Sequence, residues 1–127
     1  MNNAIGWFEI YVDNMPRAKA FYEAVFDIEL SVLDMSHMEG MGMEMLGYPS
    51  DMEAYGASGA LVQMPGVAAG VGGTLVYFSC NDCAIEQARV EAAGGKVEHE
   101  KFPIGEHGFI SMVYDTEGNM IGLHSMA

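Results

Sequence analysis

The sequence predicts an α+β domain built from two copies of a βαβββ module. A strand followed by a helix opens the chain, and the same pair of elements returns 68 residues later, so that Val12 aligns with Cys80 and Asn14 with Asp82. Three short strand-like runs follow each predicted helix. This repeated order indicates an internal duplication. It places two modules, residues 5–66 and 74–126, in a single domain spanning residues 1–127.

The first module begins with alternating apolar and polar residues at 7–12, the pattern of a half-buried strand. Asn14 is a good helix N-cap and Pro16 suits the first turn, which predicts a helix from there to about Phe26. The spacing i, i+3, i+4, i+7 predicts its buried face: Ala18, Phe21, Tyr22 and Val25. Turn residues then separate predicted strands at 29–33, 41–46 and 59–64.

The second module repeats this plan. A strand is predicted at 74–80, and Asp82 caps a predicted helix at 83–93 that Gly94 and Gly95 close. The same helical spacing predicts an apolar face made of Ile85, Ala88, Arg89 and Ala92. Strands are predicted at 96–100, 109–114 and 120–124, and the glycine-rich residues 67–73 form the linker between the modules.

Composition limits the possible functions. The chain has 18 acidic and 5 basic residues, and its net charge of −13 repels phosphate backbones and anionic lipids. We therefore expect no nucleic-acid and no membrane partner. No secretory signal is visible at the N-terminus, and two cysteines are too few for a disulfide scaffold, so we expect a cytoplasmic protein.

Four segments resemble the vicinal oxygen chelate superfamily, which includes glyoxalase I, bleomycin-resistance proteins and extradiol dioxygenases. They are residues 7–12 (Trp-Phe-Glu-Ile-Tyr-Val), residues 17–22 (Arg-Ala-Lys-Ala-Phe-Tyr), Asp82 with the helix up to Gly95, and residues 115–123 (Asp-Thr-Glu-Gly-Asn-Met-Ile-Gly-Leu). The resemblance is greatest to the small bacterial glyoxalase-like proteins. It implies curved mixed sheets around a cavity, and a homodimer in which the paired modules often come from two chains.

The resemblance also implies positions for a divalent metal. The ligands of the family correspond here to Trp7, Leu75 and Gly122, and Gln63 is a loosely aligned fourth donor. Trp and Leu offer no lone pair to such a cation, and glycine has no side chain. We therefore expect no metal and no cofactor.

Strand alternation predicts which side chains face the cavity. If Phe8 and Ile10 pack on the helix, the opposite face carries Trp7, Glu9 and Tyr11. By the same rule the second module contributes Leu75, Tyr77, Ser79, Met120, Gly122 and His124. Aromatic walls with a few polar groups suit a small, partly apolar organic ligand. We expect the ligand-binding residues to be Trp7, Tyr11, Gln63, Leu75, Ser79, His107 and Met120.

Glu9 is the most informative polar residue, because it interrupts an otherwise aromatic and aliphatic strand. A carboxylate in an apolar cup is suited to general acid–base work, with His124 assisting and Tyr77 donating a hydrogen bond to a developing oxyanion. Alternatively, Glu9 belongs to a structural network with Tyr77 or His124, and His124 is simply a strand-end residue. His107 lies either in a lid over the cavity or in a solvated turn.

Two other motifs have open interpretations. Cys80 and Cys83 form a C-x-x-C pattern that fits a redox pair, or a core position followed by a helix start. The methionine-rich residues 35–45, which include His37, fit a Cu(I) site or a methionine-lined mouth for apolar ligands.

The sequence features are compatible with three alternative functions. The first is an enzyme of the glyoxalase type, a lyase or isomerase, with Glu9, His124 and Tyr77 as catalytic residues. The second is a protein of the resistance type that sequesters a small molecule without converting it. The third is a regulatory protein with a vestigial cavity.

Overall fold

Two four-stranded sheets and two helices form the fold, and the α+β prediction is confirmed. The computed structural model describes all residues except 1–4, 6, 34–39, 41, 52 and 73. The first module contains β1 (Phe8–Tyr11), α1 (Met15–Phe26), β2 (Ser31–Val32), β3 (Glu44–Gly47) and β4 (Gly59–Gln63). The second contains β5 (Val76–Ser79), α2 (Cys83–Val90), β6 (Lys96–Pro103), the 3-10 turn η2 (Gly105–His107), β7 (Phe109–Tyr114) and β8 (Met120–Ser125).

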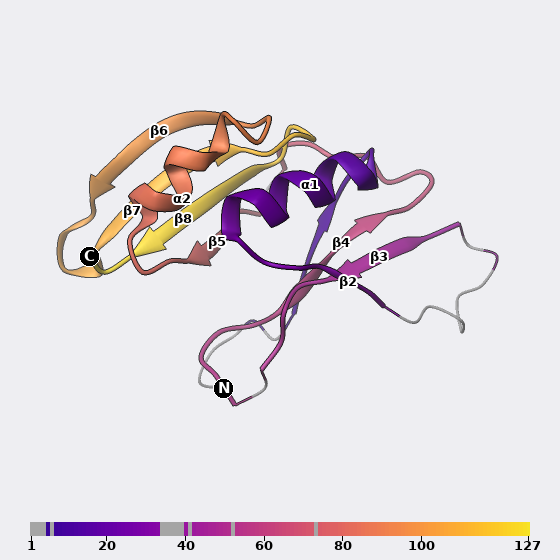
Figure 1. Ribbon diagram of the computed structural model, residues 1–127, viewed down its shortest axis with the longest axis horizontal. Helices are drawn as coiled ribbons and strands as arrows, with labels where there is room; N and C mark the ends of the chain where they lie inside the picture. The colour runs from indigo at the N-terminus through magenta and orange to yellow at the C-terminus, as the bar shows by residue number, and fades with distance from the viewer. Residues whose placement is uncertain (1–4, 6, 34–39, 41, 52, 73) are drawn as a thin grey trace.

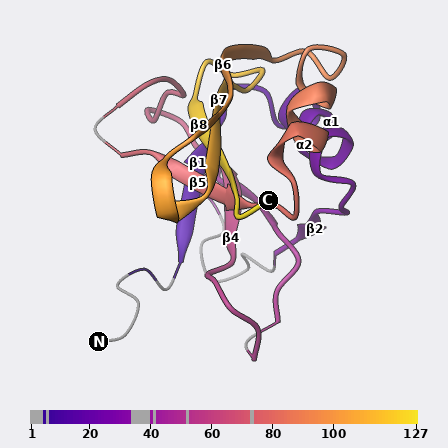
Figure 2. The same ribbon diagram turned by 90° about the vertical axis from the view of Figure 1, so that its left-hand side faces the viewer.

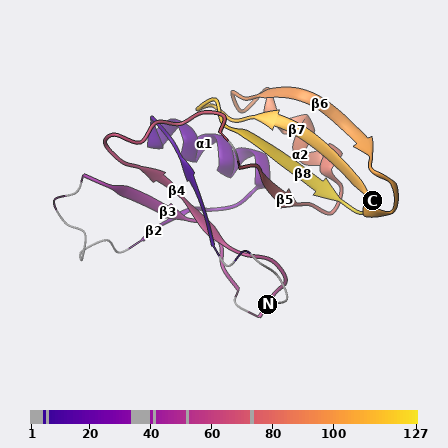
Figure 3. The ribbon, with the colours of Figure 1, turned by 180° about the vertical axis from the view of Figure 1, so that it is seen from behind.

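The sheets have matching topology, with strand orders β1-β4-β3-β2 and β5-β8-β7-β6 (Figure 1). In each sheet the first and last strands of the module pair in parallel, and the remaining neighbours are antiparallel. Both helices lie on the same side of the two sheets, as the side view shows (Figure 2). From behind, the strands lie in front of the helices (Figure 3). One face of each sheet therefore builds the core, and the described helices leave the other face uncovered.

Helix α1 agrees with the sequence prediction. The Asn14 side chain accepts a hydrogen bond from the Arg17 N–H at 3.1 Å, which caps the first turn. The four residues of its predicted face, Ala18, Phe21, Tyr22 and Val25, are all fully buried. Repeated apolar spacing on a helix long enough for three turns thus identified the buried side correctly.

Replacing Asp27 with glycine is expected to stabilise the protein by about 0.5–1 kcal/mol. Asp27 ends α1 in the left-handed conformation, with φ 53° and ψ 54°, and its N–H bonds to the carbonyl of Glu23. A Cβ strains this conformation, and glycine removes that strain while keeping the N–H. Urea denaturation of the wild type, Asp27→Gly and Asp27→Ala checks this. An equal or greater stability of the alanine variant would contradict it.

The predicted apolar face of α2 is wrong. Ile85 is 52% exposed, and the helix instead buries Cys83 and Val90. Ile85 follows Cys83 by two residues, about 200° around the helix, so both cannot face the sheet. The helix also ends at Val90, and turns occupy the last three residues of the predicted 83–93. With only eight helical residues, packing on the sheet rather than apolar spacing sets the rotation.

The remaining strand boundaries differ from prediction mainly at their ends. β6 continues to Pro103, past the predicted residue 100, with register shifts around His99 that bend it along β7. β3 begins only at Glu44. Residues 35–39 and 41 of the methionine-rich segment lie outside the described part of the chain, so nothing tests its copper and mouth interpretations. Neither described helix is long and apolar enough to cross a membrane.

Aromatic side chains join the two modules beneath the sheets. Phe78 of β5 stacks on Phe26 of α1 at 4.6 Å between centroids and meets Phe8 of β1 edge-on at 5.8 Å. Tyr22 and Tyr48 complete this cluster. Because β1 and β5 both contribute rings to it, the cluster fixes the two edge strands next to each other.

Candidate functional site

An open groove of about 630 Å³ lies between the two modules. Its walls come from β1, from the start of β5, from the start of β8 and from the linker between the modules. Ile10 is buried towards α1, so alternation turns Glu9 and Tyr11 to the helix-free side. Leu75 and Met120 face them from the second module. The volume lies in the range of pockets that hold small organic ligands.

Glu9 accepts two hydrogen bonds from its own strand. Tyr11 donates its hydroxyl at 2.9 Å, and the indole Nε1 of Trp7 donates at 3.3 Å. The hydrogen bond to Glu9 raises the pKa of Tyr11, and partial burial and the negative charge of Glu9 raise it further. The three cavity-facing residues predicted for β1 therefore do lie on one face and contact one another.

Two expectations about Glu9 need correction. The side chain is exposed to water, so within this chain the groove is an open face and not a closed apolar cup. Glu9 also makes no hydrogen bond with Tyr77 or His124; its partners are Trp7 and Tyr11. The strand pattern gave the correct face, but enclosure depends on what covers that face.

His124 does not pair with Glu9. It follows Met120 by four residues on β8, about 13 Å further along the strand. There its Nε2 lies 2.7 Å from the backbone carbonyl of His107. The His107 side chain is 75% exposed, and Ser79 pairs with His124 in register. These three predicted site residues thus gather at the other end of β8, away from the groove.

The Tyr77 ring covers Gly122, the residue at one of the positions where the resemblance implies a metal ligand. A Cβ added to Gly122 would lie 2.2 Å from Cδ1, 2.4 Å from Cε1 and 2.9 Å from Cγ of the Tyr77 ring. Three atoms of one ring at these distances mean that the ring lies across the Gly122 backbone. Gly122 is buried beneath it, whereas Tyr77 is 47% exposed. The outer face of the ring is therefore open to solvent.

Gln63, predicted as a ligand-binding residue, lies outside the groove between the modules. Its side-chain oxygen accepts the backbone N–H of Met15 at 2.8 Å, at the start of α1. Gln63 therefore points to the helix side of the sheet, since the register places it on the face shared by Leu61 and Ile10. It supports the helix N-terminus, and it lines a neighbouring groove with Asp13 and Glu44 rather than the groove between the modules.

The residues at the family's ligand positions do not fit a metal. Trp7 and Leu75 supply no suitable donor, Gly122 is covered by the Tyr77 ring, and Gln63 faces the helix. Among the described residues, no group of three His, Cys, Asp or Glu side chains is placed to hold an ion.

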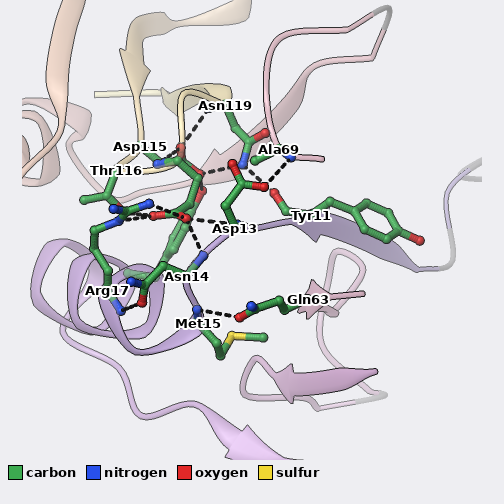
Figure 4. A network of polar contacts seen from close by, with 12 residues as sticks. Tyr11, Asp13, Asn14, Met15, Arg17, Gln63, Ala69, Asp115, Thr116 and Asn119 are labelled. Carbon is green, nitrogen blue, oxygen red and sulfur yellow. Dashed lines mark hydrogen bonds and ion pairs between the residues drawn. The ribbon is translucent and has the colours of Figure 1, made fainter. Parts of the chain in front are cut away.

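A network of polar contacts joins the two modules around the buried carboxylate of Glu117, and Figure 4 shows its partners Asn14, Arg17 and Thr116. Arg17 donates to the carboxylate of Glu117 from Nε at 2.7 Å and from Nη2 at 2.9 Å. The backbone N–H groups of Asp13 and Asn14 donate to Oε1 of the same carboxylate. Burial alone would raise the pKa of Glu117. The hydrogen bonds from Arg17, Thr116 and the two backbone N–H groups outweigh that effect and lower it to about 2.

Asn119 is a groove residue that sequence reasoning missed. Its amide Nδ2 donates to the carbonyl of Tyr11 at 2.8 Å and to Asp115 at 2.9 Å, and its Oδ1 accepts from the Gly70 N–H at 2.8 Å. One side chain thus connects β1, the last turn of the second module and the linker. In the sequence, Asn119 stands out only as one residue of the family-like segment 115–123, and no local pattern indicates that its side chain reaches the other module.

The linker was also missed as part of the site. Ala68, Gly70, Val71 and Gly72 line the groove, and the Ala69 N–H bonds to Asp13 at 3.0 Å. A second groove of about 520 Å³ meets the first at Ala68 and carries Asp13 and Glu44. The glycine-rich composition indicated only a connector, whereas its backbone forms one rim.

The two cysteines of the C-x-x-C pattern differ in burial, and Cys80 is only partly buried. Cys83 is fully buried at the start of α2, and its N–H bonds to Ser125 Oγ. Burial, followed by the charge of Glu86 and a hydrogen bond to it, raises the pKa of Cys80 to about 12. A thiol that stays protonated is a poor nucleophile, which favours the core interpretation over the redox one.

Comparisons with known proteins agree with this architecture. Glyoxalase I from Zea mays matches with a TM-score of 0.70 and 19% identity over 98% of this chain, which spans about half (48%) of the maize enzyme. A glyoxalase-related enzyme from Fulvimarina pelagi matches with a TM-score of 0.68 and 15% identity, covering 97% of this chain and 88% of its own. These similarities establish the fold.

A third solved structure has a binding function in its name. TnmS3, an antibiotic binding protein from Streptomyces sp. CB03234, matches with a TM-score of 0.67 and 22% identity over 98% of this chain and 97% of its own. No curated protein matches the chain. The family model of the Glyoxalase/Bleomycin resistance protein/Dioxygenase superfamily matches residues 4–123, and the protein therefore belongs to that superfamily.

Proposed function

We propose that this protein binds a small, partly apolar organic molecule in the groove between its modules, sequesters it without converting it, and uses no divalent metal. The observation that carries the proposal is the groove itself: it has the volume of a ligand site, and Leu75 and Met120 give it apolar walls. The residues at the usual ligand positions cannot assemble a metal site there. The antibiotic-binding protein of the same fold supports a binding role.

Sequestration is favoured over catalysis by the surroundings of Glu9. The carboxylate is open to water and already accepts hydrogen bonds from Tyr11 and Trp7. Such a group is a good acceptor for a bound ligand. The histidine expected to assist it in proton transfer, His124, is engaged instead with the carbonyl of His107.

The test is a thermal-shift screen of flat aromatic compounds in EDTA and in excess Mg²⁺ or Zn²⁺, followed by mass spectrometry of the recovered compound. A binder should raise the melting temperature equally in both conditions, by mass action, and should be recovered unchanged. Leu75→Trp fills the groove and should abolish the shift. Ile85→Trp, on the exposed side of α2, is the matched control and should retain it.

Product formation, or stabilisation that requires a divalent ion, would overturn the proposal. We also propose that the protein is a cytoplasmic homodimer. The dimer is supported by exposed apolar side chains near the groove: Trp7, just before β1, is 48% exposed, and Val71 of the linker is 68% exposed. Light scattering on the same samples reports the oligomeric state, and a monomer at micromolar concentration would contradict that part.

A further inference from the structure

The aromatic surface beside the groove has one free face. Because the Tyr77 ring lies across Gly122, its inner face is packed and its outer face is open. Leu75, which lines the groove, precedes Tyr77 by two residues on the same face of the chain, about 7 Å away. A planar ring can therefore stack on Tyr77 while the rest of the same molecule reaches the groove.

The described lining of the groove carries a single charge, and it is negative. Among the described residues that line it, Glu9 has the only charged side chain, and the two donors that contact Glu9, Trp7 and Tyr11, are neutral. The basic side chains near the modules' contact are engaged elsewhere. Arg17 binds Glu117, Arg89 donates to the carbonyl of Val25, and Lys101 binds Asp82.

These surroundings discriminate between ligands by charge. An anion would approach an uncompensated carboxylate in a protein of net charge −13. A cation would gain from the carboxylate and from the negative faces of the exposed Tyr77 and Trp7 rings. We infer that the site takes a flat aromatic cation, whose ring stacks on the open face of Tyr77 and whose positive group lies at the Glu9 carboxylate. The inference rests on the proposed function and names the class of its ligand.

Three probes of nearly the same shape test the inference. They are N-methylacridinium (a cation), acridine at pH 8 (neutral) and acridine-9-carboxylate (an anion), each titrated calorimetrically into the intact protein. We expect the cation to bind at least about 10-fold more tightly than acridine, and the anion to bind most weakly. Quenching of Trp7, the single tryptophan of the chain, gives a second readout.

Variants separate the two contacts. Glu9→Gln should weaken binding of the cation about 10-fold and leave binding of acridine unchanged. The preference for the cation over acridine should therefore disappear. Glu98→Gln, on the exposed strand β6, changes the net charge by the same amount and should have no effect. Tyr77→Leu keeps an apolar side chain over Gly122 but removes the aromatic ring, so all three probes should bind more weakly. The melting temperature of this variant verifies that it folds.

The outcomes distinguish the inference from the proposed function. Equal binding of acridine and the cation, or equal losses in Glu9→Gln and Glu98→Gln, would overturn the cation inference and leave a neutral-ligand groove intact. If none of the probes binds and the compound screen also yields no groove-dependent shift, the proposed function fails as well.

Discussion

Glu117→Gln is expected to destabilise the protein by about 2–3 kcal/mol at neutral pH. The side chain of Glu117 is fully buried and accepts hydrogen bonds from Arg17, from Thr116 and from the two backbone N–H groups that follow β1. A glutamine amide would turn an N–H₂ group towards some of these donors and would leave Arg17 without its counter-ion. Urea denaturation at pH 7 measures the loss.

The control for this prediction is Glu98→Gln, which removes an exposed carboxylate and should change stability by less than about 0.5 kcal/mol. A Glu117→Gln variant within that margin of the wild type would show that the buried ion pair contributes nothing net. A destabilised variant should also bind groove ligands more weakly, because Glu117 fixes the backbone of Asp13 next to the groove linker.

The same carboxylate predicts how stability depends on pH. Its folded-state pKa is about 2, below the ordinary value of 4.5, so the unfolded chain takes up the proton first as pH falls. The stabilisation is therefore complete above about pH 5 and is lost progressively towards pH 2, with a total of about 3 kcal/mol. Glu117→Gln should show a flatter curve over this range. Parallel curves for the two proteins would contradict the prediction.

Gly95→Ala is the second large effect, with an expected loss of about 3 kcal/mol, or about 10 °C in melting temperature. A Cβ at this position would lie 2.5 Å from the carbonyl oxygen of Tyr114 and 2.5 Å from Cε1 of Phe21. The Phe21 ring is fully buried, so moving either this ring or the Tyr114 backbone away from the new Cβ would disturb the core. Gly95 is thus a close contact between the two modules.

Gly72→Ala is the matched control, because its added Cβ would meet no atom within 4 Å. Thermal unfolding of both variants compares the two sites. A Gly95→Ala protein as stable as Gly72→Ala would mean that α1 and the turn after α2 can separate at little cost. The aromatic cluster would then be the main connection between the modules.

Local patterns in the sequence determined most of the fold. Features that depend only on neighbouring residues could be predicted directly from the sequence. They are the alternation in β1, the capping residues Asn14 and Asp82, and the apolar face of α1. The rotation of α2 could not be predicted in this way. Its few helical residues give a weak periodic signal, and contact with the sheet decides which side is buried.

The candidate site divides in the same way. Strand alternation placed Trp7, Glu9 and Tyr11 on one face. The residue types at positions 7 and 75 already excluded Trp7 and Leu75 as metal ligands. The reach of Gln63 to α1 and the separation of His124 from Glu9 depend on distances between segments that no local pattern encodes.

By itself, the sequence determined two βαβββ modules, the face of β1 that carries the acidic residue, and the strong negative charge. Only the tertiary structure decided that the Tyr77 ring covers Gly122, that Asn119 ties the linker to both modules, and that the groove is open. The physical reason is range. Propensity and alternation act over a few residues, whereas a groove is made by side chains that meet only after distant strands have packed together.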